Sequence, residues 1–135
     1  MAIRTSGSIT FADWRETPAG PDGTYPRLSR ASVVNHYAGG IEAAGTVCEY
    51  AIAYTTEKTG TCTGMELLAG RLDGREGNFV IEQRATFAED GSVRATFTVV
   101  PGSGTGELAG LRGEGEFSYQ PGQSPFPYSF DYLLD

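Results

Sequence analysis

Hydrophobic and polar residues alternate along this chain, and apolar positions recur at a spacing of two more often than at three or four. Such alternation is typical of β-strands that bury one face. The segments that carry it, such as "SRASVVNHY", "NFVIEQRATF" and "VRATFTVV", are rich in the β-branched and aromatic residues that favour strands. Because glycine or proline interrupts almost every window that a helix would need, the pattern predicts an all-β protein.

Turn sequences separate these segments at regular intervals: "PAGPDGTYP", "AGG", "TTEKTG", "DGREG", "EDGS", "PGSGTG" and "QPGQSP". Seven turns imply eight strands, and short turns join antiparallel neighbours. Eight strands in this order can close into a barrel, which leaves no exposed sheet edge. We therefore expect one domain over residues 1–135, a closed eight-stranded antiparallel up-and-down barrel, with an open eight-stranded sandwich as the alternative.

The segment "GMELLAGRLDGREGNFVIEQ" predicts a hairpin whose inner face can be identified, with its turn centred on Gly74 and Arg75. Arg71, Glu82 and Arg84 then share the outer, solvated face. The inner face has three facing pairs: Gly70 with Phe79, Leu68 with Ile81, and Glu66 with Gln83. Glu66 and Gln83 are thus predicted to form a polar pair inside an apolar lumen.

The preceding hairpin places either Cys48 or Glu49 beside Glu66, and a difference of one residue in register decides which. If Glu49 faces the lumen, the two carboxylates would share a proton at neutral pH. If it faces outward, it is an ordinary solvated strand residue. A disulfide between Cys48 and Cys62 needs a different register again and is not favoured.

The glycine-rich segment "VVPGSGTGELAGLRGEGEF" does not match a nucleotide-binding motif. It lacks the lysine and the following helix of a phosphate-binding loop, and a dinucleotide fingerprint would need a βαβ unit. Leu108, Leu111 and Phe117 need burial, which excludes a flexible linker. We interpret the segment as a tight turn followed by a strand whose glycines allow sharp bends, with an anion-binding nest of backbone amides as the alternative.

The composition narrows the classes of partner and cofactor. The 135 residues carry a formal net charge of -7, and the 10 Lys and Arg residues are scattered, which argues against nucleic-acid binding. No secretory signal and no run of about 18 apolar residues occurs, so we expect a cytoplasmic protein without a membrane partner. Two cysteines and one histidine do not make a zinc site, and no calcium-loop pattern is present, so we expect no metal and no other cofactor.

Several blocks of the sequence, "FADWRETP", "GMELLAGRLDGREGNFV", "GSGTGEL" and "YSFDYLL", resemble the bacterial DUF3224 family, a domain of unknown function with an allene-oxide-cyclase-like β-barrel. The resemblance covers nearly the whole chain and implies the same eight-stranded, calycin-like barrel. Family members often carry a histidine near the position of Gln83, so the resemblance brings no shared acid–base role to this residue. Allene oxide cyclases hold apolar substrates in the lumen, and a similar activity here would be an analogy at the level of the fold.

Four residues are candidates for catalysis. Glu66 is the first, because a carboxylate that faces an apolar lumen is suited to proton transfer, and Gln83 would assist it. The alternative is that Glu66 is a structural carboxylate held by hydrogen bonds. Glu49 would join them if it faces the lumen. His36, at a strand end, is suited to acid–base chemistry near neutral pH, although such a histidine is more often a surface residue.

Seven residues are predicted to contact a ligand: Trp14, Tyr50, Leu68, Phe79, Ile81, Tyr128 and Phe130. The last two belong to a row of aromatics, Phe126 to Tyr132, that alternates along the final strand and so shares one face. This row lines a ligand cavity, fills the lumen, or packs against a second subunit in a homodimer.

Two functions remain open from the sequence. The first is a small-molecule-binding barrel that acts as a cofactor-free cyclase or isomerase on an apolar, polyketide- or lipid-like substrate, whose folded conformation the lumen would impose. The second is a non-catalytic binding or structural barrel with a filled lumen. An interior void of about 300 Å³ or more that opens at one end would favour a ligand.

Overall fold

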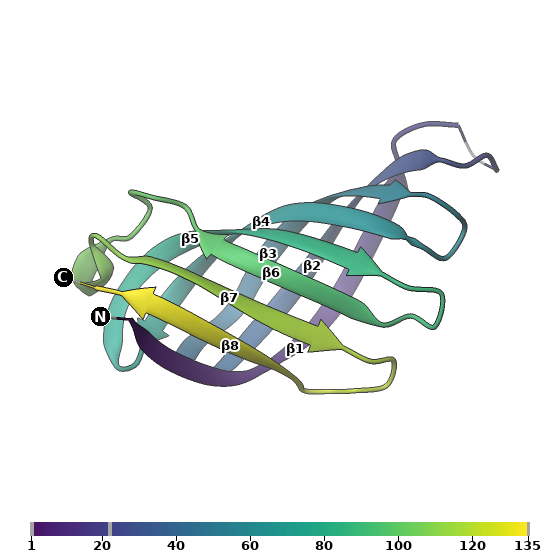
Figure 1. Cartoon of the computed structure of the whole chain (residues 1–135). Helices are drawn as coiled ribbons and strands as arrows, with labels where there is room; N and C mark the ends of the chain where they lie inside the picture. Colours follow the sequence, from purple (N-terminus) through teal and green to yellow (C-terminus); the bar gives the residue numbers. More distant parts are fainter. Residues whose placement is uncertain (1, 22, 135) are drawn as a thin grey trace.

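The backbone forms eight antiparallel strands that close into a barrel in chain order (Figure 1). The computed structural model describes residues 2–21 and 23–134. The strands are β1 Ile3–Pro18, β2 Arg27–Gly39, β3 Ile41–Tyr54, β4 Gly60–Leu72, β5 Arg75–Phe87, β6 Val93–Val99, β7 Arg112–Tyr119 and β8 Phe126–Leu133. Pairing of β1 with β8 closes the ring, so the predicted up-and-down barrel is confirmed and the open sandwich is wrong.

Alternate residues of each strand point into the barrel, as the spacing of two requires. In β8, Phe126, Tyr128, Phe130 and Tyr132 are all buried. They face the lumen, so the predicted shared face is confirmed, and an outward aromatic face against a second subunit is wrong for this row.

The hairpin of β4 and β5 turns at Asp73 and Gly74, where both residues have positive φ, 46° and 87°. This Asp-Gly pair forms the tight two-residue connection that matches the twist of paired strands. Leu72 therefore faces Arg75, and Leu68 faces Phe79. The predicted register was wrong by two residues, but an even shift keeps every side chain on its predicted face.

One end of the barrel is closed by the glycine-rich connection between β6 and β7. A short 3-10 helix, η1 (Gly106–Leu108), lies at the end shown on the left of Figure 1. Leu108 and Leu111 are 0% and 1% exposed and join the core cluster that contains Phe79 and Phe130. The segment is therefore a hydrophobic plug. The predicted tight turn is confirmed at its start, where the Ser103 N–H donates to the Val100 carbonyl oxygen at 3.1 Å, and the predicted strand is β7; η1 between them was not predicted.

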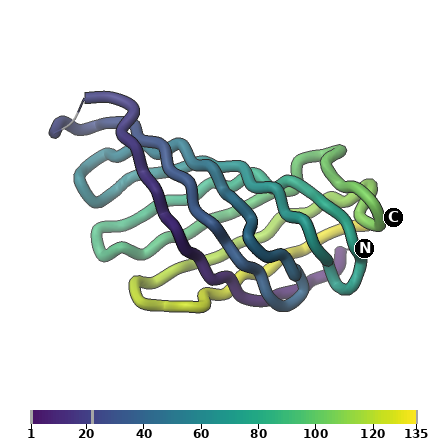
Figure 2. Tube along the Cα trace, turned by 180° about the vertical axis from the view of Figure 1, so that it is seen from behind, coloured from purple at the N-terminus to yellow at the C-terminus, as the bar shows by residue number. Residues whose placement is uncertain are grey.

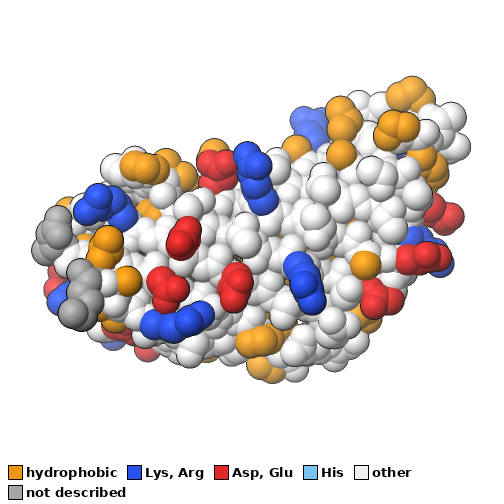
Figure 3. Space-filling model, in the orientation of Figure 1, with side chains coloured by type: hydrophobic (Ala, Val, Ile, Leu, Met, Phe, Trp, Pro, Cys, Tyr) orange, Lys and Arg blue, Asp and Glu red, His pale blue; other side chains and the backbone are white. Residues whose placement is uncertain are grey.

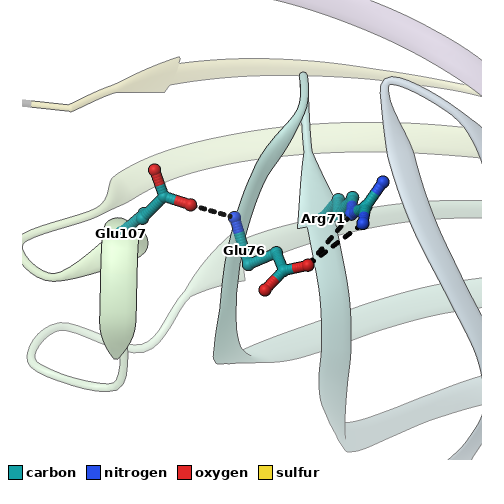
Figure 4. Close-up of polar contacts among 3 residues, drawn as sticks. All are labelled: Arg71, Glu76 and Glu107. Atoms are coloured by element: carbon teal, nitrogen blue, oxygen red, sulfur yellow. Dashed lines mark hydrogen bonds and ion pairs between the residues drawn. The ribbon is translucent and has the colours of Figure 1, made fainter.

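Strand β5 holds this plug in place. The Asn78 N–H donates to Thr105 Oγ1 at 3.0 Å, and the Glu76 N–H donates to the Glu107 carboxylate at 3.1 Å (Figure 4). The Glu76 carboxylate also pairs with Arg71 at 3.0 Å. A Cβ on Gly77 would lie 2.1 Å from the Thr105 carbonyl oxygen, so only glycine lets the plug approach the strand this closely.

The opposite end of the barrel is open. There the β1–β2 hairpin extends beyond the other turns, as the views from both sides show (Figures 1 and 2). A β-bulge between Ala12 and Arg15, with Asp13 at a φ of 58°, changes the direction of β1 at this point. The bulge brings Trp14 to the rim of the open end.

The face of the barrel that Figure 3 shows carries charges of both signs rather than a basic patch. Acidic and basic side chains are interspersed over the face that Figure 3 shows. In the part of the chain that the structure describes, we find no helix with the length and apolar character needed to cross a membrane.

We predict that Leu108→Ala lowers the free energy of unfolding by about 2–5 kcal/mol, because it leaves a cavity in the plug. Leu67→Ala is the matched control, since Leu67 is 53% exposed on β4; its effect should stay within about 0.5 kcal/mol. Urea denaturation measures both. Equal losses in the two variants would contradict the role of the plug.

Candidate functional site

The open half of the lumen contains a cavity of about 280 Å³. All eight strands contribute to its wall, and more than half of the lining residues are aromatic. The lining residues are Ile9, Phe11, Trp14, Val33, Asn35, Tyr37, Tyr50, Ile52, Tyr54, Cys62, Gln83, Ala85, Phe87, Val93, Phe117, Tyr119 and Phe126. The lumen is thus filled at the plugged end and hollow at the open end.

The Glu66 carboxylate is 1% exposed and bonds to residues that line this cavity. Its Oε1 accepts hydrogen bonds from Gln83 Nε2 at 2.7 Å and from the Tyr37 hydroxyl at 2.9 Å. Its Oε2 accepts from Asn35 Nδ2 at 3.1 Å and from the Thr46 hydroxyl. Four donors on two oxygens suit an ionised carboxylate, which only accepts. No ion pair to Glu66 is found within the described ranges, so all its partners are neutral.

Glu66 itself lies behind the cavity wall. Three of its partners, Asn35, Tyr37 and Gln83, line the cavity, whereas Glu66 does not. A ligand in the cavity would therefore contact these three residues rather than Glu66 itself. The predicted interior pair of Glu66 and Gln83 is confirmed as a direct hydrogen bond. Its catalytic role stays a prediction.

Tyr50 extends the polar network from β3 past β4 to Gln83 on β5. Its ring lies over Gly64 of the neighbouring strand, where an added Cβ would come within 2.6 Å of the ring. The hydroxyl reaches past this glycine and donates to Gln83 Oε1 at 2.7 Å. Gln83 is therefore fixed at both ends, accepting from Tyr50 and donating to Glu66.

Burial keeps the hydroxyls and thiols of the site protonated. Burial, followed by the charge of Glu66, raises the pKa of Tyr37 well above its usual value. Burial also raises the pKa of Tyr50. The pKa of Cys48 is raised first by burial and then by Glu66, and burial raises that of Cys62 to about 11. At neutral pH the site therefore offers neutral tyrosines and no thiolate nucleophile.

A bulge in β3 brings Thr46 to Glu66. The register shifts between Ala43 and Cys48, and Gly45 has a φ of 67°. The N–H of Gly45 donates to His36 Nδ1 at 3.0 Å. His36 is exposed on the outer face and braces this bulge, because alternation along β2 sends Asn35 and Tyr37 inward and His36 outward. The alternative of a surface histidine is therefore confirmed, and His36 does not belong to the lumen site as an acid–base residue.

The open choice between Cys48 and Glu49 is settled in favour of Cys48, which faces Glu66. Glu49 is exposed and faces Met65 on the outer side of the sheet. The prediction of Glu49 as a second lumen carboxylate is therefore wrong. Cys48 and Cys62 are both free thiols.

Only part of the predicted ligand-contacting set lines the cavity: Trp14 and Tyr50 do. The others belong to the packed half of the core, namely Leu68, Phe79, Ile81, Tyr128 and Phe130. There, the Phe79 and Phe130 rings stack with centroids 6.3 Å apart, and the Tyr128 hydroxyl accepts from the Ile41 N–H at 2.8 Å. We correct their assignment: these side chains fill the lumen beneath the cavity.

Asn35, Tyr37 and Thr46 were not anticipated as site residues. The alternation in "SVVNHY" does place Asn35 and Tyr37 on one face with Val33, and this signal could have identified them. Thr46 returns to the interior only because of the bulge, which the pattern does not show.

An acidic and a basic side chain, Glu16 and Arg27, both contact Tyr54, which lines the cavity. The Glu16 carboxylate accepts from the Tyr54 hydroxyl at 2.6 Å and from Trp14 Nε1 at 3.2 Å. The Arg27 guanidinium lies 5.1 Å from the centroid of the Tyr54 ring. The two charges oppose each other at the entrance.

A larger hollow of about 930 Å³ lies on the outer surface over β4 to β8. Its polar lining consists mainly of exposed threonine, serine and arginine side chains, such as Thr63, Arg84 and Ser118. It holds no buried polar cluster comparable with Glu66 and its partners, so we take the lumen cavity as the candidate site. Among the described residues no group of three or more His, Cys, Asp or Glu side chains could hold a metal ion.

Comparison of the chain with known proteins identifies its family and a solved structure with the same fold. Residues 5–132 match the model of a family described as "Protein of unknown function (DUF3224)". The crystal structure of a DUF3224 protein of unknown function from Shewanella oneidensis MR-1 superimposes with a TM-score of 0.77 at 27% identity, covering 100% of this chain and 99% of that one. No functionally curated protein matches the chain.

We predict that Glu66→Leu lowers the free energy of unfolding by about 3–5 kcal/mol, because it leaves four buried donors without their acceptor. Glu49→Leu, on the outer face of the adjacent strand, is the control and should change stability by less than about 1 kcal/mol. Chemical denaturation compares the two. A loss for Glu66→Leu no greater than for Glu49→Leu would show that the network does not stabilise the fold.

Proposed function

The chain belongs to the DUF3224 family, and we propose that it binds a small, mainly apolar molecule in the open half of its lumen. The observation that carries the proposal is the pairing of an aromatic-walled cavity of about 280 Å³ with a buried polar floor. Apolar walls with a few fixed polar groups are typical of small-molecule sites. A purely structural barrel with a filled lumen explains the plugged half but not the hollow one.

The size of the cavity limits the ligand. The volume of about 280 Å³ lies just below the size of about 300 Å³ at which the usual range for ligand sites begins. It suits a molecule of one ring with a short side chain rather than a long lipid. The aromatic wall would bury the apolar body, and the polar atoms of Asn35, Tyr37 and Gln83 would orient a single polar group.

The polar floor is organised before any ligand arrives. Tyr50 and Glu66 hold Gln83 from opposite ends, and Glu66 also holds Asn35 and Tyr37. These side chains are already immobilised, so binding would not have to order them. This lowers the entropic cost of recognition and supports a binding role.

We predict that phenethyl alcohol, a neutral probe with one ring and one hydroxyl, binds with a dissociation constant of about 1 mM or lower. Ala85→Leu should weaken binding at least about tenfold, because Ala85 lines the cavity and the added carbons occupy it. Ala51→Leu, which adds the same carbons at an exposed position of β3, should leave binding unchanged.

Nuclear magnetic resonance titration of backbone amides measures the affinity and locates the site. Shifts confined to the outer surface, or equal affinity of Ala85→Leu and the wild type, would rule out the lumen as the binding site.

Catalysis by a cofactor-free isomerase or cyclase, as in the fold-level analogy with allene oxide cyclases, is a second candidate. One observation favours it: Tyr37 lines the cavity, and its hydroxyl donates to Glu66. A substrate C–H proton could pass to the Tyr37 oxygen while the hydroxyl hydrogen passes to the carboxylate. Returning the proton to a different carbon of the substrate would complete an isomerisation without a cofactor.

We predict that the protein accelerates conversion of a β,γ-unsaturated cyclohexenone into its conjugated isomer, followed by ultraviolet absorbance. Tyr37→Phe should lower the rate at least about 100-fold, because it removes the relay. Tyr54→Phe removes a hydroxyl from the same cavity at its rim and should retain activity. Turnover that equals the buffer rate, or that survives Tyr37→Phe, would eliminate the catalytic candidate and leave the binding role.

A further inference from the structure

The polar end of the cavity carries a negative charge that the described residues do not compensate. Glu66 is fully enclosed, and its four partners, two amides and two hydroxyls, are neutral. Hydrogen bonds from neutral donors stabilise the carboxylate but leave its net charge in place. In surroundings of low polarity such a charge acts over a longer range than it would in water.

The hydroxyl hydrogens of Tyr37 and Tyr50 are already engaged within the protein. Tyr37 donates to Glu66, and Tyr50 donates to Gln83. Each phenol oxygen has then used its single hydrogen and retains lone pairs that can only accept. A ligand group that donates hydrogen bonds fits these oxygens.

The wall is suited to a positive charge as well. Aromatic rings attract a cation that lies over their faces, and the cavity is lined mainly by such rings. At the rim the chain's own Arg27 already lies over Tyr54 at 5.1 Å, with the Glu16 carboxylate bound to the same tyrosine. Deeper in the lumen, the charge that contacts the lining residues Asn35, Tyr37 and Gln83 is the Glu66 carboxylate.

From these three observations we infer that the ligand is a small protonated amine with an apolar body, its ammonium group placed against the oxygens of Tyr37 and Tyr50. The inference rests on the proposed binding function and names its ligand class. An ammonium group would donate to both phenol oxygens and compensate Glu66, whereas a carboxylate or phosphate at that place would be repelled.

Three probes with similar bodies and different charges test the inference at neutral pH: phenethylamine, phenethyl alcohol and phenylacetate. We expect the amine to bind at least about tenfold more tightly than the alcohol, and phenylacetate to bind most weakly. In Glu66→Gln the advantage of the amine should fall to within about threefold, since this variant keeps the side-chain size and removes the charge. Glu49→Gln removes an equal charge from the outer face and should keep the full advantage.

Circular dichroism establishes that each variant is folded. If Glu66→Gln does not fold, Tyr37→Phe replaces it, because it deletes one acceptor oxygen; loss of part of the amine advantage supports the inference and an unchanged advantage overturns it. Equal binding of amine and alcohol to the wild type, or an advantage that survives Glu66→Gln, also overturns it. Failure of all three probes to bind the wild type would instead reject the proposed binding function.

Discussion

The buried carboxylate of Glu66 is the constraint on which the rest of the lumen depends. A charged group that is only 1% exposed lowers the stability of the fold unless hydrogen-bond donors surround its oxygens. The donors come from β2, β3 and β5, so the four strands β2 to β5 must keep one register for the network to exist. The network thereby ties the pairing of these strands to the shape of the cavity floor.

The two ends of the barrel differ in how their side chains pack. At one end, the plug of Leu108 and Leu111 and the stacked rings of Phe79 and Phe130 form a dry core. At the other end the aromatic side chains stand around a void and several reach solvent, with Trp14 48% exposed. Apolar surface that is left unpaired at a concave opening is typical of a recognition site, because contact with a ligand would bury it.

Local irregularities in the strands position several side chains of the candidate site. The bulge of β3 returns Thr46 to the interior, and the bulge of β1 brings Trp14 to the rim. Gly64 leaves the space through which Tyr50 reaches Gln83. Gly64 keeps its regular pairing with Tyr50 and Gln83, whereas the two bulges interrupt otherwise regular ladders. Such interruptions cost pairing energy, which is consistent with a functional demand at this end of the barrel.

Alternation and turn residues in the sequence were sufficient to determine the eight strands, their order, and the inward direction of Glu66, Gln83 and the row from Phe126 to Tyr132. These properties are local, since each follows from a spacing of two or from a short turn. The tertiary structure alone decided that Cys48 rather than Glu49 faces Glu66, and that Phe79 packs into the filled half while Tyr50 lines the hollow one. Register across a bulge and the sum of side-chain volumes around a closed ring depend on all strands at once, and no single segment contains that information.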